Sequence, residues 1–401
     1  MQESTGFMNG DWDYLNLRGD TGPCVYPAGF LYVFSVLRML TSNGSDILLG
    51  QYLFAALYLI FIAVLLWLYY RVMVDDGDDN GNSSSEAKNE YHLPAFWIIV
   101  LLCASRRIHS IFVLRLFNDA IAMIFVYLAI LAFVYDYWTS GTLMFSMALS
   151  IKMNILLFVP GLLVLYVKRF GFIRSWIQIA LLVLVQVLLA IPFLWVNAPG
   201  YMERAFNFGR EFTFIWTVNY KFLPQEIFVG KPLARGLLIG HVLTLLFFGF
   251  RRWTREEGGP FRLIFKGGNE RTRGKRMTAH HIVKTLFESN VIGIVFARSL
   301  HFQFYVWYYH QLPLLLFSMT RVPLWLKLTA MGAIEVIWNI FPSTPVTSLC
   351  LTVIHVALLV GMAFGQPLYS AYHRYSTQSG NDQDVKRRTT LRSGPESKKM
   401  S

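Results

Sequence analysis

The chain alternates between long apolar runs and short polar stretches. A membrane-spanning helix needs about 20 mostly apolar residues, and on that measure we count about eleven predicted spans. The runs lie at residues 52–70, 94–113, 120–134, 143–150, 155–167, 176–196, 236–250, 282–297, 328–341 and 346–365. Continuous apolar runs of this kind predict an all-α membrane protein, a multi-pass helical bundle.

Composition supports this fold class. Of 401 residues, 55% are hydrophobic and only 15% are charged, whereas soluble domains carry roughly 25% charged residues. The net charge is +12. In a membrane protein such an excess is typical of Lys- and Arg-rich cytosolic loops, so we attribute the charge to these loops and expect no nucleic-acid partner. The cysteines Cys24, Cys103 and Cys350 are far apart and form no metal or disulfide pattern.

Three regions follow from the pattern. Residues 1–50 are polar and rich in turn formers, apart from an apolar stretch at 26–40 that predicts a helix at the membrane interface. Residues 51–365 form the predicted transmembrane domain. Residues 366–401 are polar and basic, which predicts a disordered tail.

The basic loops set the expected orientation. Placing the basic segment 251–276 in the cytosol also places the C-terminal tail there. Residues 1–50, 115–119, 152–154, 197–232 and 298–301 then gather on the opposite, luminal face. The acidic loop predicted at 75–90 lies in the cytosol.

Residues 106–119 place charges where apolar residues are expected. Ionisable groups at membrane depth are costly and by default face a polar cavity or a partner. In a continuous helix Arg107, Arg115 and Asp119 would share one face, with Arg115 and Asp119 as an i,i+4 pair. Two interpretations stay open, a structural ion pair between helices and an anion-accepting cavity.

Five motifs, in order, resemble the dolichyl-phosphate-mannose-dependent alpha-1,3-mannosyltransferase family of the endoplasmic reticulum. They are GDTGPCVYPAG at 19–29, RIHSIFVLRLFND at 107–119, SIKMN at 150–154, WTVNYKFLP at 216–224 and RSLHFQFYVWYYHQLP at 298–313. The match covers residues 1 to 365.

The resemblance implies a GT-C fold, in which luminal loops cover the active site of a helical bundle. It implies transfer of mannose from dolichyl-phosphate-mannose, in alpha-1,3 linkage, to the five-mannose oligosaccharide on dolichyl pyrophosphate. It implies partners in the two lipid-linked sugars and the membrane lipid, and no metal or other cofactor. Lysines at 398 and 399 match a dilysine retrieval signal of the endoplasmic reticulum.

Candidate site residues come from these motifs and from the chemistry. The dolichyl phosphate leaves as an anion, so cations should hold it and a carboxylate should take the proton of the acceptor hydroxyl. The candidates for phosphate binding are Arg115, Lys152, Arg298 and His301; those for stacking on sugars are Trp216, Tyr220, Trp307 and Tyr308; those for the carboxylate are Asp20 and Asp119.

One element of the family pattern is missing. The resemblance implies an acidic residue in a short Asp-Trp motif just after the first transmembrane helix, and Asp11-Trp12 lies too far along to be that motif. We therefore expect the first helix and the general base upstream of Met1. Asp20 and Asp119 are then candidates for binding more than for chemistry.

Two other function classes remain. A transporter or lipid scramblase would also bury charges in a polar cavity, but transporters usually contain repeats with broken helices, and we find no internal repeat. Another GT-C mannosyltransferase is the second alternative, and the motifs at 19–29 and 298–313 argue against it.

Overall fold

The computed structural model describes residues 2–20, 22–79, 95–207, 214–267 and 275–365. The first half of the chain forms α1 (Gln2–Met8), α2 (Ala28–Leu40), α3 (Ile47–Asp79), α4 (Ala95–Cys103), α5 (Arg106–His109), α6 (Asn118–Val134), α7 (Trp138–Ile151) and α8 (Val159–Phe170). The second half forms α9 (Phe172–Ala205), α10 (Gln225–Val229), α11 (Lys231–Phe248), α12 (Pro260–Lys266), α13 (Ala279–Phe296), α14 (Leu312–Phe317), α15 (Leu324–Asn339) and α16 (Pro345–Phe364). Short turns are η1 (Ser42–Gly44), η2 (Ser110–Leu114), η3 (Met153–Phe158), η4 (Phe214–Trp216), η5 (Gly249–Trp253), η6 (Phe302–Trp307) and η7 (Tyr309–Gln311).

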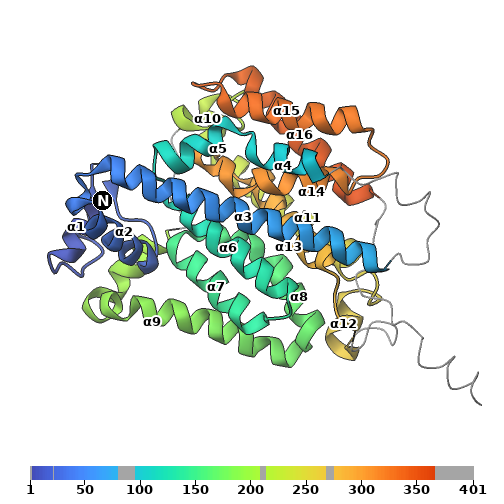
Figure 1. Ribbon diagram of the computed structural model, residues 1–401, viewed down its shortest axis with the longest axis horizontal. Coiled ribbons are helices and arrows are strands. Elements are labelled where there is room, and N and C mark those ends of the chain that lie inside the picture. Colours follow the sequence, from blue (N-terminus) through green and yellow to red (C-terminus); the bar gives the residue numbers. More distant parts are fainter. Residues whose placement is uncertain (1, 21, 80–94, 208–213, 268–274, 366–401) are drawn as a thin grey trace, which may run out of the picture.

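The core lies around α6 and α13, which are buried along almost their whole length. Helices α3 and α7 pack on α6, and α8, α11 and α16 pack on α13. Figure 1 shows α3 crossing the front of the bundle, with α9 along its lower edge and α15 and α16 along its upper edge. A small antiparallel hairpin, β1 (Arg18–Gly19) with β2 (Gly22–Pro23), joins α1 to α2.

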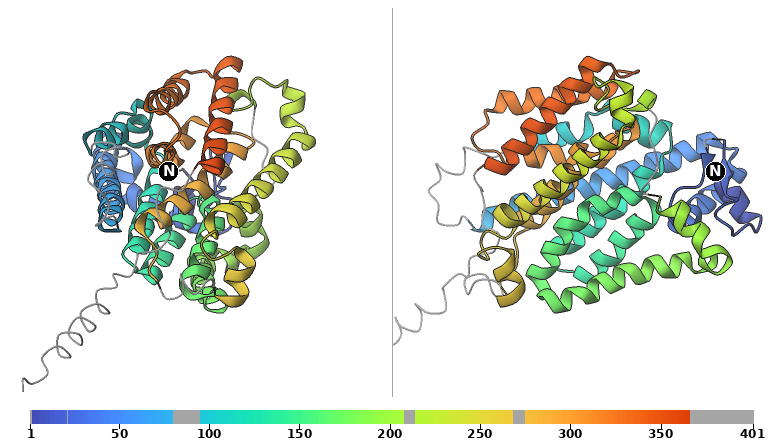
Figure 2. Two further views of the ribbon diagram at one scale, coloured as in Figure 1. Left: turned by 90° about the vertical axis from the view of Figure 1, so that its right-hand side faces the viewer. Right: turned by 180° about the vertical axis from the view of Figure 1, so that it is seen from behind.

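Outer helices expose large apolar side chains. On α9, Trp195 is 90% and Ile173 is 82% exposed, and α11, on the face opposite to α3, is similarly exposed (Figure 2). Such extended apolar surfaces mark contact with another apolar phase. Within the described residues, five helices are long and apolar enough to cross a membrane, or six if the bent pair Trp97–Cys103 and Arg106–Leu114 is one span.

The predicted fold class is therefore confirmed as an all-α membrane protein, and helices occupy the predicted apolar runs. The apolar stretch at 26–40 is helical as α2. The count of about eleven spans stays a prediction, as does the division into three regions. The tail at 366–401 lies outside the described residues, as do residues 80–90 of the predicted acidic loop, whereas Asp75 is a buried residue of α3.

The continuous helix predicted through 94–113 and on to Asp119 is wrong. The chain bends by 48° between α4 and α5, and Leu116 then adopts the left-handed conformation with φ 53° before α6 begins at Asn118. Apolar periodicity could not reveal this break, because no Pro or Gly marks it. The break at Leu116 consequently separates Asp119 from Arg107 and Arg115. Arg107 instead donates from Nε to the Trp338 carbonyl at 3.0 Å.

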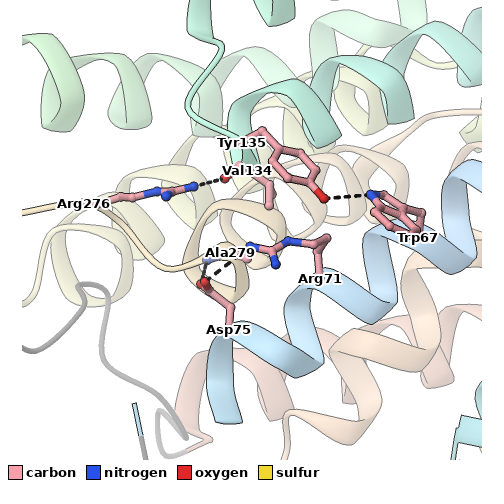
Figure 3. A network of polar contacts seen from close by, with 7 residues as sticks. All are labelled: Trp67, Arg71, Asp75, Val134, Tyr135, Arg276 and Ala279. Atoms are coloured by element: carbon pink, nitrogen blue, oxygen red, sulfur yellow. Dashed lines mark hydrogen bonds and ion pairs between the residues drawn. The ribbon is translucent and has the colours of Figure 1, made fainter. Parts of the chain in front are cut away.

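A polar network ties the helices together at the C-terminal end of α6 (Figure 3). Asp75 accepts the backbone N–H of Ala279 at 2.5 Å, and Arg276 donates to the Val134 carbonyl at 2.8 Å. Beside them Trp67 donates to the Tyr135 hydroxyl at 2.9 Å. These bonds join α3, the C-terminal end of α6 and the start of α13. None of them involves the N-terminal end of α6.

Two of the motifs meet where α2 packs on α7. A Cβ placed on Gly29 would lie 2.0 Å from Ser150 Oγ and 2.9 Å from the Ser150 carbonyl oxygen. Only a residue without a side chain permits this approach. The glycine that ends the first motif thus sets the position of α2 against the third.

We expect Gly29→Ala to lower the free energy of unfolding by about 1–3 kcal/mol, the usual cost of overpacking a core. Thermal unfolding in detergent, followed by tryptophan fluorescence, measures the change. Gly236→Ala in α11 is the matched control, because a Cβ there meets nothing within 4 Å. Equal melting temperatures for the two variants would contradict the close packing of α2 on α7.

Candidate active site

The first turn of α6 carries the centre of the candidate site. Asp119 is fully buried, and a carboxylate in this position is favoured by the positive end of the helix dipole. Its Oδ2 lies 3.0 Å from Nζ of Lys152, and its Oδ1 accepts the indole N–H of Trp307 at 2.6 Å. Both carboxylate oxygens are therefore bonded to groups that stabilise the charged form.

Lys152 reaches this carboxylate because α7 ends there. The residue caps α7 in an extended conformation, and η3 follows at once. Its Nζ also donates to Asn118 Oδ1 at 3.2 Å and lies 4.9 Å from the ring centroid of Tyr26. Phe304 stacks on Trp307 with centroids 3.7 Å apart and covers the cluster from another side.

Four of the five motifs therefore converge on one cluster. Tyr26 comes from the first motif, Asp119 from the second, Lys152 from the third and Trp307 from the fifth. The fourth motif binds the fifth instead, since Asn219 Oδ1 accepts the Leu300 N–H at 2.7 Å. Two interpretations of the charges at 106–119 were open. Asp119 forms an ion pair between elements, and its partner is Lys152, which sequence spacing did not suggest.

An open cavity of about 290 Å³ adjoins the cluster. Its lining is polar at Gln2, Glu3 and Asn118 and apolar elsewhere, at Tyr26, Phe30, Phe34, Leu116 and Phe117. Ligand pockets run from roughly 300 Å³ upward, so the cavity matches a small group such as one sugar ring. Gln2 and Glu3 were not predicted as site residues. They belong to a short polar segment, and nothing in its sequence indicates that it lines a cavity.

Asp20 lies at the tip of the β1–β2 hairpin and not in the cluster. Its Oδ2 accepts Gln2 Nε2 at 2.6 Å, and its backbone N–H donates to Gln2 Oε1 at 2.6 Å. This paired contact fixes α1 against the hairpin. The structure therefore places the predicted carboxylates Asp20 and Asp119 in different positions, the first bonded to Gln2 and the second to Lys152 and Trp307.

The other predicted cations differ in their surroundings. Arg115 is exposed, and its guanidinium makes no hydrogen bond or ion pair within the described residues. Arg298 donates from Nε to the Phe228 carbonyl at 3.2 Å. The ring of His301 lies 5.2 Å from that of Phe304, which places it beside the cluster.

The predicted aromatic residues divide in the same way. Trp307 belongs to the cluster, and Trp216 is 48% exposed and stacks on Phe341. Tyr220 is buried, donates to the Val295 carbonyl at 2.7 Å, and has its pKa raised by burial to about 12. Tyr308 is fully buried, and its hydroxyl accepts the Trp338 indole N–H at 2.7 Å.

Other reactive groups offer little chemistry. Burial raises the pKa of the Cys24 thiol to about 12, so this cysteine stays protonated and acts as a packing residue. Within the described part of the chain, no group of three or more His, Cys, Asp or Glu side chains is arranged to hold a metal ion.

The fold and this cluster define a helical membrane protein that carries a buried, charged and aromatic site beside a small cavity. A family model described as "ALG3 protein" matches residues 1–348, and the chain belongs to that family. The resemblance found from the five motifs is thereby confirmed.

Curated relatives agree along most of the chain. Proteins of Mus musculus and Homo sapiens named "Dol-P-Man:Man(5)GlcNAc(2)-PP-Dol alpha-1,3-mannosyltransferase" are 42% and 41% identical, covering 90% and 91% of this chain and 78% and 80% of their own lengths. A protein of Dictyostelium discoideum whose name reads "Probable" before the same words is 41% identical over 95% of this chain and 87% of its own length. No solved structure matches the chain.

Proposed function

We propose that this protein transfers mannose from dolichyl-phosphate-mannose to the five-mannose oligosaccharide on dolichyl pyrophosphate, in alpha-1,3 linkage, at the Asp119–Lys152 cluster and its adjoining cavity. The reaction is proposed from the names of relatives that are 41–42% identical to this chain. The location of the active site is proposed from the contacts that bring four of the five motifs together at Asp119 and Lys152.

The chemistry requires one bond to form and one to break. An acceptor hydroxyl oxygen bonds to the anomeric carbon of mannose while the bond from that carbon to the phosphate oxygen breaks. The hydroxyl proton goes to a base, and dolichyl phosphate leaves as an anion that cations stabilise. Exposed Arg115, the residue directly after η2, is the proposed cation for this phosphate because its guanidinium makes no hydrogen bond or ion pair within the described residues.

Asp119 is proposed as a positioning residue. Both its oxygens are already bonded, to Lys152 and to Trp307, and it is fully buried. It fixes the Trp307 indole and the Lys152 side chain, and Nζ of Lys152 lies 4.9 Å from the ring centroid of Tyr26 in the cavity wall. Asp119 and Lys152 thus belong to the proposed site, where they hold neighbouring side chains in position.

The membrane arrangement is proposed with the function. The protein lies in the endoplasmic reticulum membrane as a GT-C bundle, with the N-terminal end of α6 on the luminal face and the C-terminal tail in the cytosol. The basic segment 251–276 supports this orientation, and the cluster and the polar network of Figure 3 lie at opposite ends of α6.

A transfer assay tests the function. The protein is reconstituted in nanodiscs with synthetic dolichyl-phosphate-mannose and the five-mannose lipid-linked acceptor. We expect a six-mannose product whose new linkage an alpha-1,3-specific mannosidase removes. Absence of product with both substrates present, or a different linkage, would contradict the proposal.

We expect Arg115→Ala to lower kcat/KM by about ten- to hundred-fold, since it removes one cation from the leaving phosphate. Arg115→Lys should recover part of the rate, because it restores a point charge without the planar fork. Arg174→Ala, an exposed arginine of α9, is the control. Wild-type rates in Arg115→Ala would remove Arg115 from the site.

A further inference from the structure

The short helix α1 brings a carboxylate to the wall of the cavity. Glu3 and Gln2 of α1 line the cavity, as does Asn118 of α6. Two contacts fix α1 there: the paired bonds between Gln2 and Asp20, and the hydrogen bond from Arg38 to the Thr5 hydroxyl. The carboxylate of Glu3 is therefore held by the fold at this wall.

A second group on the wall lacks a partner. Asn118 is 5% exposed, and its Oδ1 accepts Lys152 Nζ. Its Nδ2 is buried and has no hydrogen-bond partner among the described residues. A buried donor left unpaired is energetically costly, so an oxygen atom of a ligand would be a favourable partner for this amide.

Another part of the lining is aromatic. Tyr26 lies two residues before α2 and Phe30 and Phe34 lie within it, and the three rings follow one another with centroids 4.4 Å and 4.6 Å apart. A ligand that fits must therefore present an apolar face to these rings and polar groups to the other side. A ligand group that meets the Glu3 carboxylate must be an O–H or N–H donor, because a carboxylate only accepts hydrogen bonds, and Asn118 Nδ2 requires an acceptor.

Charge decides between the two substrates. A phosphate in this cavity would face the carboxylate of Glu3, and like charges repel. The ammonium of Lys152, which contacts the lining residues Asn118 and Tyr26, is directed to Asp119 and Asn118. A sugar is a neutral ring with hydroxyls at its edge and C–H groups on its face. Its hydroxyls can bond to the polar lining residues, and its C–H groups can pack on the aromatic rings.

We propose that this cavity is the subsite for the accepting mannose of the oligosaccharide, with Glu3 and Asn118 binding its hydroxyls and the rings of α2 stacking on its C–H face. Asp20 is then a positioning residue that holds α1 through Gln2. This inference rests on the proposed function and deepens it, because it separates the acceptor sugar from the donor phosphate.

Binding measurements on the full chain in nanodiscs test the subsite. The acceptor probe is a synthetic five-mannose pyrophosphoryl lipid with a short isoprenoid chain, and the donor probe is dolichyl-phosphate-mannose, each added alone and followed by thermophoresis. Glu3→Ala should raise the acceptor Kd about ten-fold or more, since hydrogen bonds to charged groups contribute about 1.5–3 kcal/mol, and should leave the donor Kd unchanged.

A second variant moves Glu3 without removing it. A Cβ on Gly19 would lie 2.8 Å from Gln2 Oε1 and 3.3 Å from Glu3 Oε1, both at the ends of flexible side chains. Gly19→Ala should therefore weaken acceptor binding with an unchanged melting temperature. Glu226 is an exposed carboxylate of α10, and Glu226→Ala is the control for Glu3→Ala.

The outcomes separate the two proposals. A raised donor Kd in Glu3→Ala, or an unchanged acceptor Kd in both Glu3→Ala and Gly19→Ala, would overturn the subsite. Failure of the wild-type protein to transfer mannose, while it binds the acceptor through Glu3, would instead overturn the proposed function alone.

Discussion

Asp119→Ala is expected to lower the free energy of unfolding by about 3–5 kcal/mol, because removal of one partner leaves a buried charge uncompensated. The side chain of Lys152 is only 10% exposed and that of Asp119 is 0% exposed. The variant should also lose mannosyl transfer, since the Trp307 indole loses its acceptor. Thermal unfolding in detergent and the transfer assay measure the two effects.

The double variant Asp119→Leu with Lys152→Met is the control. Replacing a buried pair by apolar residues is often neutral for stability, so the double variant should melt above the single one and still lack activity. Asp119→Asn keeps an acceptor for Trp307 and isolates the loss of charge. An Asp119→Ala protein as stable as the wild type would contradict the ion pair.

Lys168→Ala should have an effect of similar size at the other end of the bundle. Lys168 Nζ lies 2.8 Å from Glu257 Oε1, and both side chains are fully buried. The pair fixes the turn after α11 to the end of α8, and its loss should again lower the free energy of unfolding by about 3–5 kcal/mol. Substrate Kd values should not change, because the pair lies away from the cluster and its cavity.

The neighbouring residue provides a matched control. Arg169 pairs with Asp136 at 2.7 Å, but the two side chains are 41% and 35% exposed. Exposed pairs contribute about 0–1 kcal/mol, so Arg169→Ala should melt close to the wild type. Melting temperatures that fall equally in Lys168→Ala and Arg169→Ala would show that burial does not decide the strength of these pairs.

The sequence predicted the helices well because their signal is local. Apolar runs at 52–70, 176–196 and 346–365 became α3, α9 and α16, since a continuous apolar stretch in lipid must satisfy its backbone within a helix. Within α13 the i,i+4 residues Lys284 and Glu288 also form a pair, with Nζ and Oε1 3.9 Å apart, so this contact too follows from local spacing. The motifs also identified the family before any contact was known.

Local spacing failed where the chain turns without a sequence signal. It paired Arg115 with Asp119, but the left-handed Leu116 separates them. The actual partners of Asp119 are 33 and 188 residues away, at Lys152 and Trp307. A pair chosen by the packing of distant helices leaves no periodicity for a sequence pattern to reveal.

By itself, the sequence determined a helical membrane protein of the mannosyltransferase family with charges concentrated near 106–119. Only the tertiary structure decided which charges meet, and it placed Glu3 and Asn118 on one cavity while burying Tyr308 in the core. The physical reason is that helices form from neighbouring residues, whereas a site forms from the ends of helices that packing brings together.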